Sequence, residues 1–245
     1  MAPAQSRRDI LKTLGLAGIG LSIANLPEFT LPALAQGETV VSFSDIPANF
    51  NPQMNAVTRT YDIRKIEGPF TPTDQFFTTQ HYGHPTVDMA AYRLKVSGMV
   101  TSPLSLSLDD LKKMNGRDLI AGFECSGNSP RLMQGFAGNG KWTGIPLRDF
   151  LKRIGADLTA KYVWFQCAEG YSNTIDMATA LHPQTQLSFK FDNQILPRKY
   201  GFPMKCRIPT KLGFKNPKYI TAIYVQNNDA GGYWENQGYN WFSGL

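Results

Sequence analysis

The sequence predicts a mixed α+β fold that is rich in strands and has only a few short helices. Short apolar runs, many of them with β-branched or aromatic residues, recur between turn-forming residues. Signals for the start and stop of a helix frame only short segments. The 245 residues are 42% hydrophobic and 18% charged, which suits one large domain or two small ones with a sizeable core.

The expected strands are spread along the chain. Residues 91–97 alternate between apolar and polar side chains, as a half-buried strand does. Two further runs, 186–191 and 194–196, flank Asp192 and Asn193 and predict a hairpin. The other strands are expected at residues 118–124, 161–168, 204–208 and 219–226.

Two segments carry helix signals. Ser107 and Asp110 have the spacing of a capping box at the start of a helix over residues 108–114. Pro146 suits the first turn of a second helix, and Gly155 suits its C-terminal stop. Both predicted helices are short.

Residues 1–35 predict a twin-arginine export signal, which would place the mature chain in the periplasm. An Arg-Arg pair precedes an uncharged apolar run, and Ala-Leu-Ala at its end offers small residues to a signal peptidase. The alternatives are a soluble helix with a chance Arg-Arg pair, or export by the general route. We then expect an extended N-terminal segment over residues 36–75, a main domain over 76–245, and no transmembrane segment in the mature chain.

The net charge of +6 is modest and spread along the chain. It favours an anionic ligand or partner, and the absence of a basic block with interleaved aromatic residues argues against nucleic-acid binding. Of the three cysteines, at least one must lie outside an intrachain disulfide. Cys167 and Cys206 lie in strand-like runs, and we expect them to be core residues rather than a bridged pair.

Cys125 lies where a predicted strand gives way to a glycine-rich stretch. Residues 125–143 show no period and predict a long loop, and such loops often carry function. Three interpretations of the cysteine are open: a soft metal ligand, a buried structural residue, or a nucleophile paired with His81, His84 or His182. The hydrolase interpretation has little support because no histidine–carboxylate pair stands out.

The residues around Cys125 favour the metal ligand. Six motifs occur in order along the chain: FFTTQH (76–81), ECSGN (124–128), YSNTI (171–175), LPRKYGFPMK (196–205), GFKNPK (213–218) and GYWE (232–235). This series resembles the molybdenum domain of the sulfite oxidase family over about residues 76–241. The resemblance implies a sulfite-oxidase-type molybdopterin-binding fold and catalytic domain with a molybdenum–molybdopterin cofactor.

The resemblance also implies roles for individual residues. Cys125 takes the place of the cysteine that ligates molybdenum, and His81 the place of a histidine that touches the cofactor. Tyr171 matches a tyrosine at the mouth of the metal pocket. Lys205 and Lys218 match cofactor-binding basic residues, with Lys205 at the pterin phosphate.

The neighbouring loop completes the expected cofactor site. The backbone of Ser126, Gly127 and Asn128 would donate hydrogen bonds to the cysteine sulfur and tune the metal. Arg131 lies near the family's arginine, although the register differs by one or two residues. Tyr200 replaces a histidine of the family and retains a hydroxyl that can donate a hydrogen bond to the cofactor.

Thr79 marks a departure from the sulfite-oxidising members, which carry an arginine there. A neutral hydroxyl cannot replace the charge and bidentate fork of a guanidinium. Because that contact holds the anionic substrate, the resemblance predicts weaker binding of sulfite. We expect Thr79 and Tyr171 to flank the substrate.

The resemblance implies an enzyme that moves an oxygen atom between a small, sulfur-containing substrate and molybdenum in a two-electron step. A separate redox partner, such as a cytochrome c or a membrane-bound subunit, would exchange the electrons. The direction is open: oxidation of an oxo-acceptor, or reduction of an S-oxide or N-oxide as in the exported methionine sulfoxide reductase branch. A cofactor-free exported binding module with a structural Cys125 is the alternative.

Overall fold

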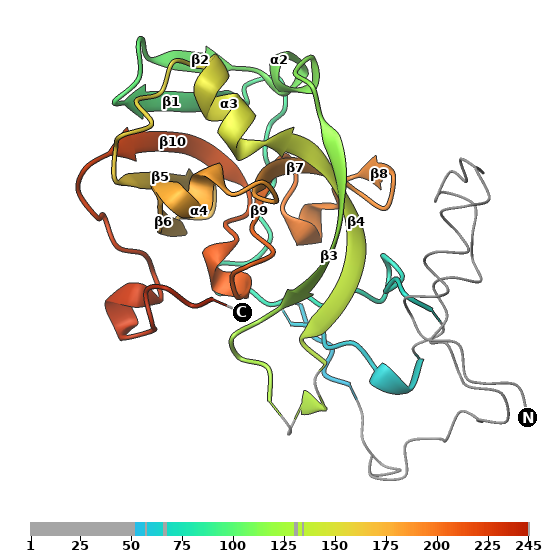
Figure 1. The fold of residues 1–245 in the computed structure, drawn as a ribbon. Helices are drawn as coiled ribbons and strands as arrows, with labels where there is room; N and C mark the ends of the chain where they lie inside the picture. Colours follow the sequence, from blue (N-terminus) through green and yellow to red (C-terminus); the bar gives the residue numbers. More distant parts are fainter. Residues whose placement is uncertain (1–51, 57, 66–67, 130–131, 134, 245) are drawn as a thin grey trace, which may run out of the picture. The chain divides into compact units, whose positions relative to one another are not determined.

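Two β-sheets form the fold (Figure 1). The computed structural model describes residues 52–56, 58–65, 68–129, 132–133 and 135–244, all within the unit Ser42–Leu245. The predicted export signal and Arg131 lie outside the described residues, as do residues 36–51 of the expected N-terminal segment. No helix in the described part is long and apolar enough to cross a bilayer.

The first sheet is mixed. Its strands, in spatial order, are β2 (Leu104–Leu106), β1 (Leu94–Gly98), β10 (Ile220–Gln226), β5 (Tyr162–Cys167) and β6 (Ser172–Asp176). β1 and β10 pair in parallel, and the other neighbours pair antiparallel. β10 therefore lies at the centre of this sheet. Residues 216–218, just before β10, line the cavity described below.

The second sheet is antiparallel. Its order is β3 (Arg117–Glu124), β4 (Ala137–Pro146), β7 (Gln186–Phe191) and β8 (Gln194–Ile195), and β9 (Lys205–Arg207) also pairs with β7. The predicted hairpin is confirmed: Asp192 and Asn193 join β7 to β8 with positive φ angles of 48° and 64°, as a two-residue turn of this kind requires.

Among the described residues the helices are few and short, as predicted. They are α2 (Leu108–Lys112), α3 (Leu147–Arg153) and α4 (Met177–Leu181), with 3-10 turns η3 (Ile63–Lys65), η5 (Arg198–Tyr200), η6 (Gly213–Lys215) and η7 (Glu235–Gln237). The capping box of Ser107 and Asp110 is present at α2. α3 starts directly after Pro146, and Gly155 follows it with a φ of +67°.

The prediction of a loop over residues 125–143 is wrong in its second half, which belongs to β4. β4 pairs with β3 without interruption from Glu124↔Ala137 to Arg117↔Gly144. Two glycines of this strand, Gly138 and Gly140, leave room for aromatic rings that lie against it. A Cβ on Gly138 would come within 2.8 Å of the Phe76 ring, and one on Gly140 within 2.3 Å of the Phe191 ring.

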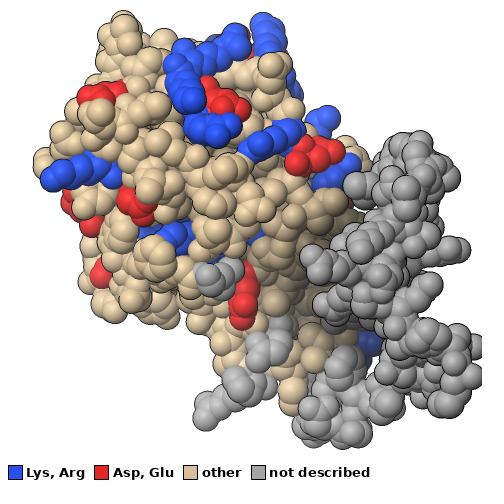
Figure 2. All heavy atoms as spheres, in the orientation of Figure 1, with Lys and Arg blue, Asp and Glu red and all other residues tan. Residues whose placement is uncertain are grey.

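Charge is distributed differently on the surface and in the interior. On the face drawn in Figure 2, basic side chains gather over α2 and α3, where Lys112, Lys152 and Arg153 end the helices. Lys205 and Arg207 instead are buried on β9. Burying a cation is costly unless an anion or hydrogen bonds compensate it, so the interior cations call for an explanation that the surface ones do not.

Candidate active site

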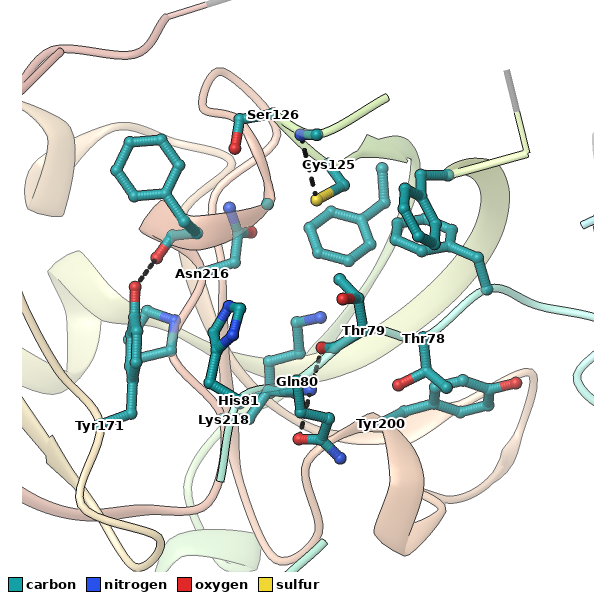
Figure 3. Close-up of a pocket in the computed structure, with 18 of the residues that line it drawn as sticks. Thr78, Thr79, Gln80, His81, Cys125, Ser126, Tyr171, Tyr200, Asn216 and Lys218 are labelled. Atoms are coloured by element: carbon teal, nitrogen blue, oxygen red, sulfur yellow. Dashed lines mark hydrogen bonds between the residues drawn. The ribbon is translucent and has the colours of Figure 1, made fainter. Parts of the chain in front are cut away.

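A cavity of about 270 Å³ brings most of the predicted site residues together. Those that line it are Thr79, His81, Cys125, Ser126, Gly127, Tyr171, Tyr200, Lys205 and Lys218. They come from segments far apart in the sequence, and Figure 3 shows Cys125, His81 and Lys218 approaching the cavity from different strands and loops. Asn128 does not line the cavity in the described structure.

Cys125 follows β3 directly and is held by its own loop. Its backbone N–H donates to the carbonyl oxygen of Phe136 at 3.0 Å, and the Gly127 N–H lies 3.4 Å from the thiol sulfur. Gly213 in η6 packs against the loop, since a Cβ there would lie 3.2 Å from the Cys125 Cα. The sulfur is therefore positioned by a strand end and by a close backbone approach (Figure 3).

The surroundings of the Cys125 thiol act on its pKa in opposite directions. Burial raises the pKa, while the Gly127 N–H, the Ser126 hydroxyl and the charge of Lys218 lower it. A buried thiol is converted to its ligand form most readily by a bound metal, which stabilises the thiolate directly. The site thus has hydrogen-bond donors for a thiolate without being a free low-pKa nucleophile.

Asn128 shapes the loop rather than facing the cavity. Its Nδ2 donates to Glu124 Oε1 at 3.1 Å, and its Oδ1 accepts the Phe136 N–H at 3.2 Å. Both bonds close the turn that follows Cys125. The expected hydrogen bond from its backbone to the sulfur is not made, because the Asn128 N–H donates to the Cys125 carbonyl oxygen at 3.0 Å.

Lys205 is a buried cation without a carboxylate partner among the described residues. Its side-chain Nζ lies 3.8 Å from the ring centroid of Phe123 and 5.0 Å from that of Trp142. Burial, and then the charges of Lys218 and Arg207, hold its pKa well below the usual range. Aromatic faces attract a cation without pairing its charge, and an anion in the cavity would favour the charged form of Lys205, so the side chain is placed to bind one.

Arg207 is a second buried basic residue of β9, two positions after Lys205. It is not among the residues that line the cavity. Its Nη1 donates to Asn216 Oδ1 at 2.9 Å, and its Nη2 donates to the Gly122 carbonyl oxygen. Its Nε has no hydrogen-bond partner in the described structure, and burial lowers its pKa to about 9. The sequence does contain a signal for Arg207, because residues 204–208 alternate between apolar side chains and the two basic residues Lys205 and Arg207.

Lys218 connects the start of β10 to the 76–81 segment. Its Nζ donates to the Thr79 carbonyl oxygen at 3.3 Å and to Gln80 Oε1 at 2.9 Å (Figure 3). Burial lowers its pKa to about 8, against the opposing charges of Glu169, Cys167 and Cys125. Thr79 therefore accepts a hydrogen bond from Lys218 with its backbone carbonyl oxygen, and it brings a neutral side chain to the cavity.

His81 lies at the rim and Tyr171 on the cavity wall. The His81 ring stacks on Tyr233 at 5.3 Å and meets Trp234 edge-on at 4.7 Å. Its pKa is lowered by burial and by the charge of Lys218, so the neutral imidazole is favoured. The Tyr171 hydroxyl donates to the Phe214 carbonyl oxygen at 2.7 Å (Figure 3), which fixes the ring.

Tyr200 is buried among aromatic rings. Its hydroxyl lies 2.7 Å from the Thr73 carbonyl oxygen and 2.8 Å from that of Phe76. A hydroxyl has one proton to donate, and these two acceptors already compete for it. The ring of Tyr200 lines the cavity, while its polar end holds the segment before Thr79 in place.

Glu169 is a cavity-lining residue that no sequence motif singles out. It lies in the turn between β5 and β6, two residues before Tyr171. Its Oε2 atom is buried and has no hydrogen-bond partner within the described structure. Burial raises its pKa to about 7, while its own backbone N–H and Lys218 act in the opposite direction.

The C-terminal segment closes one wall through a buried ion pair. The side chains of Lys215 and Glu235 are 1% and 5% exposed and bonded to each other. Asn173 Nδ2 donates to the same Glu235 carboxylate at 2.8 Å. The pair anchors the turn that brings Trp234 and Tyr239 to the cavity.

The described residues contain neither a cysteine–histidine pair typical of a hydrolase nor a metal site built of protein ligands alone. No histidine among them hydrogen-bonds to the Cys125 sulfur; His84 Nδ1, for example, lies 3.0 Å from the Tyr219 hydroxyl. No group of three or more His, Cys, Asp or Glu side chains among them could hold a metal ion. Cys167 and Cys206 are free, buried thiols, as expected.

A single thiol and cations without carboxylate partners at one cavity fit a class of protein that binds an anionic cofactor next to a cysteine. Residues 81–234 match the family described as oxidoreductase molybdopterin binding domain. The chain belongs to this family. The predicted membership is therefore confirmed, together with the sulfite-oxidase-type fold.

The relatives agree with this assignment. The chain is 53% identical over 158 residues to a provisionally assigned protein-methionine-sulfoxide reductase subunit, YedZ1, of Azospira oryzae, covering 64% of this chain and 58% of that one. It is 29% identical over 223 residues to mitochondrial sulfite oxidase of Rattus norvegicus, covering 82% and 39%. The chain thus spans less than two thirds of the length of each of these relatives.

A solved structure has the same fold. The crystal structure of the sulfane dehydrogenase SoxCD from Paracoccus pantotrophus matches with a TM-score of 0.67 at 18% identity. The match covers 87% of this chain and 57% of that chain. At this identity the similarity establishes the architecture.

Proposed function

We propose that this chain is the catalytic part of a molybdenum enzyme that removes the oxygen atom from a small S-oxide. A separate redox partner, such as a cytochrome c or a membrane-bound subunit, would supply two electrons. The observation that carries the proposal is that the Cys125 thiol and the carboxylate-free ammonium group of Lys205 line the same cavity.

The residues of the cavity suit a molybdenum–molybdopterin cofactor. When bound, it supplies the redox-active metal that exchanges the oxygen atom. Cys125 would be the protein's ligand to the metal, with the Gly127 N–H and the Ser126 hydroxyl stabilising the thiolate. Lys205 and Lys218 would bind the anionic phosphate, because Lys205 is buried, Lys218 is half-buried, and neither has a carboxylate bonded to it in the described structure.

The remaining residues would orient the substrate and limit water access. His81 stands at the rim on Tyr233 and Trp234, where a neutral imidazole can hydrogen-bond to cofactor or substrate. Tyr171 forms a fixed wall. Arg131, outside the described residues, stays a predicted cofactor contact by sequence position alone.

Two observations favour reduction of a neutral S-oxide over oxidation of sulfite. Thr79 places a neutral side chain at the cavity, which offers a dianion no countercharge. The relative at 53% identity is named as a sulfoxide reductase subunit. Oxidation of a small sulfur compound is the second candidate, because sulfite oxidases align over 82% of this chain.

The test uses the full chain expressed with its leader in a host that makes the cofactor. Molybdenum and pterin content are measured first, followed by reduction of dimethyl sulfoxide and methionine S-oxide with reduced viologen dye as electron donor. Near-stoichiometric molybdenum with S-oxide turnover supports the proposal. A molybdenum content near zero would instead favour a cofactor-free binding module in which Cys125 is structural.

Thr79→Arg tests the substrate direction. If this position contacts the substrate, the added guanidinium should improve the apparent affinity for sulfite by about 1.5–3 kcal/mol, or tenfold or more. S-oxide reduction should fall at the same time. Unchanged kinetics with both substrates would mean that the substrate lies elsewhere in the cavity.

Export by the twin-arginine route to the periplasm is part of the proposal and rests on residues 1–35. Cleavage after Ala35 should give a mature chain that begins at Gln36. Replacing the Arg7-Arg8 pair by lysines should retain the loaded protein in the cytoplasm, as N-terminal sequencing and fractionation would reveal. Continued export of the lysine variant would indicate the general route.

A further inference from the structure

Glu169 is the acidic group of the Cys125 cavity that has no assigned partner. It lines the same cavity as Cys125, Tyr171 and Lys218. Its Oε2 atom is buried and makes no hydrogen bond within the described structure. A buried, unsatisfied carboxyl oxygen is unfavourable, so its placement beside a substrate cavity suggests that it serves the reaction.

Three other proton-bearing groups of the cavity are already engaged in hydrogen bonds. The Tyr171 hydroxyl donates to the Phe214 carbonyl oxygen at 2.7 Å. The Tyr200 hydroxyl is shared between two carbonyl oxygens at 2.7 and 2.8 Å. Lys218 donates to Thr79 and Gln80. The Oε2 atom of Glu169, in contrast, makes no hydrogen bond in the described structure that a substrate would have to displace.

We propose that Glu169 is a catalytic acid that donates a proton to the substrate oxygen during S-oxide reduction, an inference that rests on the proposed function. In the complete reaction an S-oxide, two protons and two electrons give a thioether and water. The sulfur–oxygen bond breaks, sulfur gains the electron pair, and the oxygen leaves in water. Glu169 supplies one of the two protons and is reprotonated from solvent, and a one-electron donor such as reduced viologen supplies the electrons.

The charge environment of Glu169 supports this role. Burial raises its pKa to about 7, and Lys218 limits the rise. The other titratable groups that face it are the Cys167 thiol and the Tyr171 and Tyr219 hydroxyls, all with a pKa raised by burial and hence neutral at that pH. A carboxyl group that is partly protonated near neutrality is suited to general acid catalysis.

The sign of the pH dependence follows directly. The acid form of Glu169 is the active one, so turnover should be high below pH 7 and fall as pH rises through 7. A residue that only holds Lys218 in place would be required in its ionised form, and turnover would then rise over the same range. The two roles therefore predict opposite slopes.

The test compares Glu169→Gln, Glu169→Asp and the control Asp88→Asn in molybdenum-loaded protein. Asp88 is exposed and bonded locally to the Ala90 N–H. Viologen-driven reduction of dimethyl sulfoxide is measured from pH 5.5 to 9, with rates expressed per bound molybdenum. Glu169→Gln should lower kcat about 100-fold or more and abolish the fall above pH 7, while Glu169→Asp should keep a reduced rate with the same fall.

A readout independent of activity accompanies the kinetics. In the wild type, ionisation of the buried carboxyl group destabilises the native state as pH rises from about 4.5 to about 7. Glu169→Gln removes that loss, so its Tm relative to wild type should be higher at pH 8.5 than at pH 5.5. Asp88→Asn should show no such difference.

Several results would overturn the inference. One is a Glu169→Gln enzyme within threefold of the wild-type kcat and with an unchanged pH profile. Another is loss of molybdenum from that variant with an unchanged rate per molybdenum, which would make Glu169 a counter-ion for Lys218. If loaded wild type reduces no S-oxide at all, the proposed function itself fails, and this outcome is distinct from both.

Discussion

The two hydrophobic clusters of the described chain differ in chemistry. The larger one contains many aliphatic side chains from the first sheet and from α3, among them Leu94, Leu147 and Val163. The smaller one is almost entirely aromatic: Phe76, Phe77, Phe136, Trp142, Phe191, Leu196 and Tyr200, with Phe123 and Cys125 packed against it. Among the described residues, no cation lies over a buried ring of the larger cluster, whereas Lys205 and Arg207 both lie over rings that belong to or pack on the smaller one.

The difference between the two clusters shows how a buried cation can remain available for a ligand. A carboxylate next to Lys205 would neutralise it, whereas the face of an aromatic ring lowers the cost of burial by about 0.5–2 kcal/mol and leaves the charge unpaired. The aliphatic cluster has no such function and mainly removes apolar surface from water. We therefore expect substitutions in the aliphatic cluster to change stability and those in the aromatic cluster to change the site.

The largest effect is expected from Cys125→Ser. Loss of the metal ligand should lower S-oxide turnover by more than the roughly 10–100-fold that changes to outer-shell partners cost, while one atom changes and the fold is kept. The matched control is Cys167→Ser in the aliphatic cluster, which should lower the free energy of unfolding by about 1–3 kcal/mol and keep the rate per bound molybdenum. An inverted pattern would break the comparison between the clusters.

The next effect compares two apolar truncations. Leu147 is fully buried, so Leu147→Ala should cost about 2–5 kcal/mol in the free energy of unfolding and leave the molybdenum content of folded protein unchanged. Phe123→Leu removes the ring that lies 3.8 Å from Lys205 Nζ. It should cost less stability but lower the molybdenum content. Chemical denaturation and metal analysis of both variants would measure the two quantities.

Much of this arrangement is predictable from the sequence because it depends on local patterns. Alternating apolar runs indicate the strands, and the capping box at Ser107 and Asp110 is a short-range signal. The motif around Cys125 places the thiol after a strand. The roles assigned to individual site residues remain predictions until the loaded protein is studied.

The parts that could not be predicted depend on contacts between distant residues. The glycines of β4 resemble the composition of a loop, and only distant contacts explain them: the rings of Phe76 and Phe191 at Gly138 and Gly140, and the backbone of β7 at Gly144. Tyr171 bonds to Phe214, 43 residues away. The environment of Glu169 arises from segments that no local motif links, and so its raised pKa and unpaired oxygen follow from the fold alone.

A smaller effect is expected from Lys205→Met. Removing a buried, unpaired charge should leave the free energy of unfolding of the cofactor-free protein equal or higher. Retention of the cofactor should fall about 10–100-fold. Lys190→Met on the neighbouring strand β7 is the control, because Lys190 is exposed and should affect neither quantity. A strongly destabilised Lys205→Met protein would mean that the lysine serves the fold rather than the ligand.

The smallest expected effect is a pH dependence of anion binding through Lys218. Burial lowers the pKa of this side chain to about 8. The protonated ammonium group binds an anion, so affinity of cofactor-free protein for pyrophosphate should be full below pH 8 and fall by up to about tenfold as pH rises through 8. Lys218→Arg remains charged over this range and should bind equally at pH 7 and pH 9 in isothermal titration calorimetry. If wild type and Lys218→Arg lose affinity in parallel, the titrating group is not Lys218, and the availability of a buried cation to the ligand would then rest on Lys205 alone.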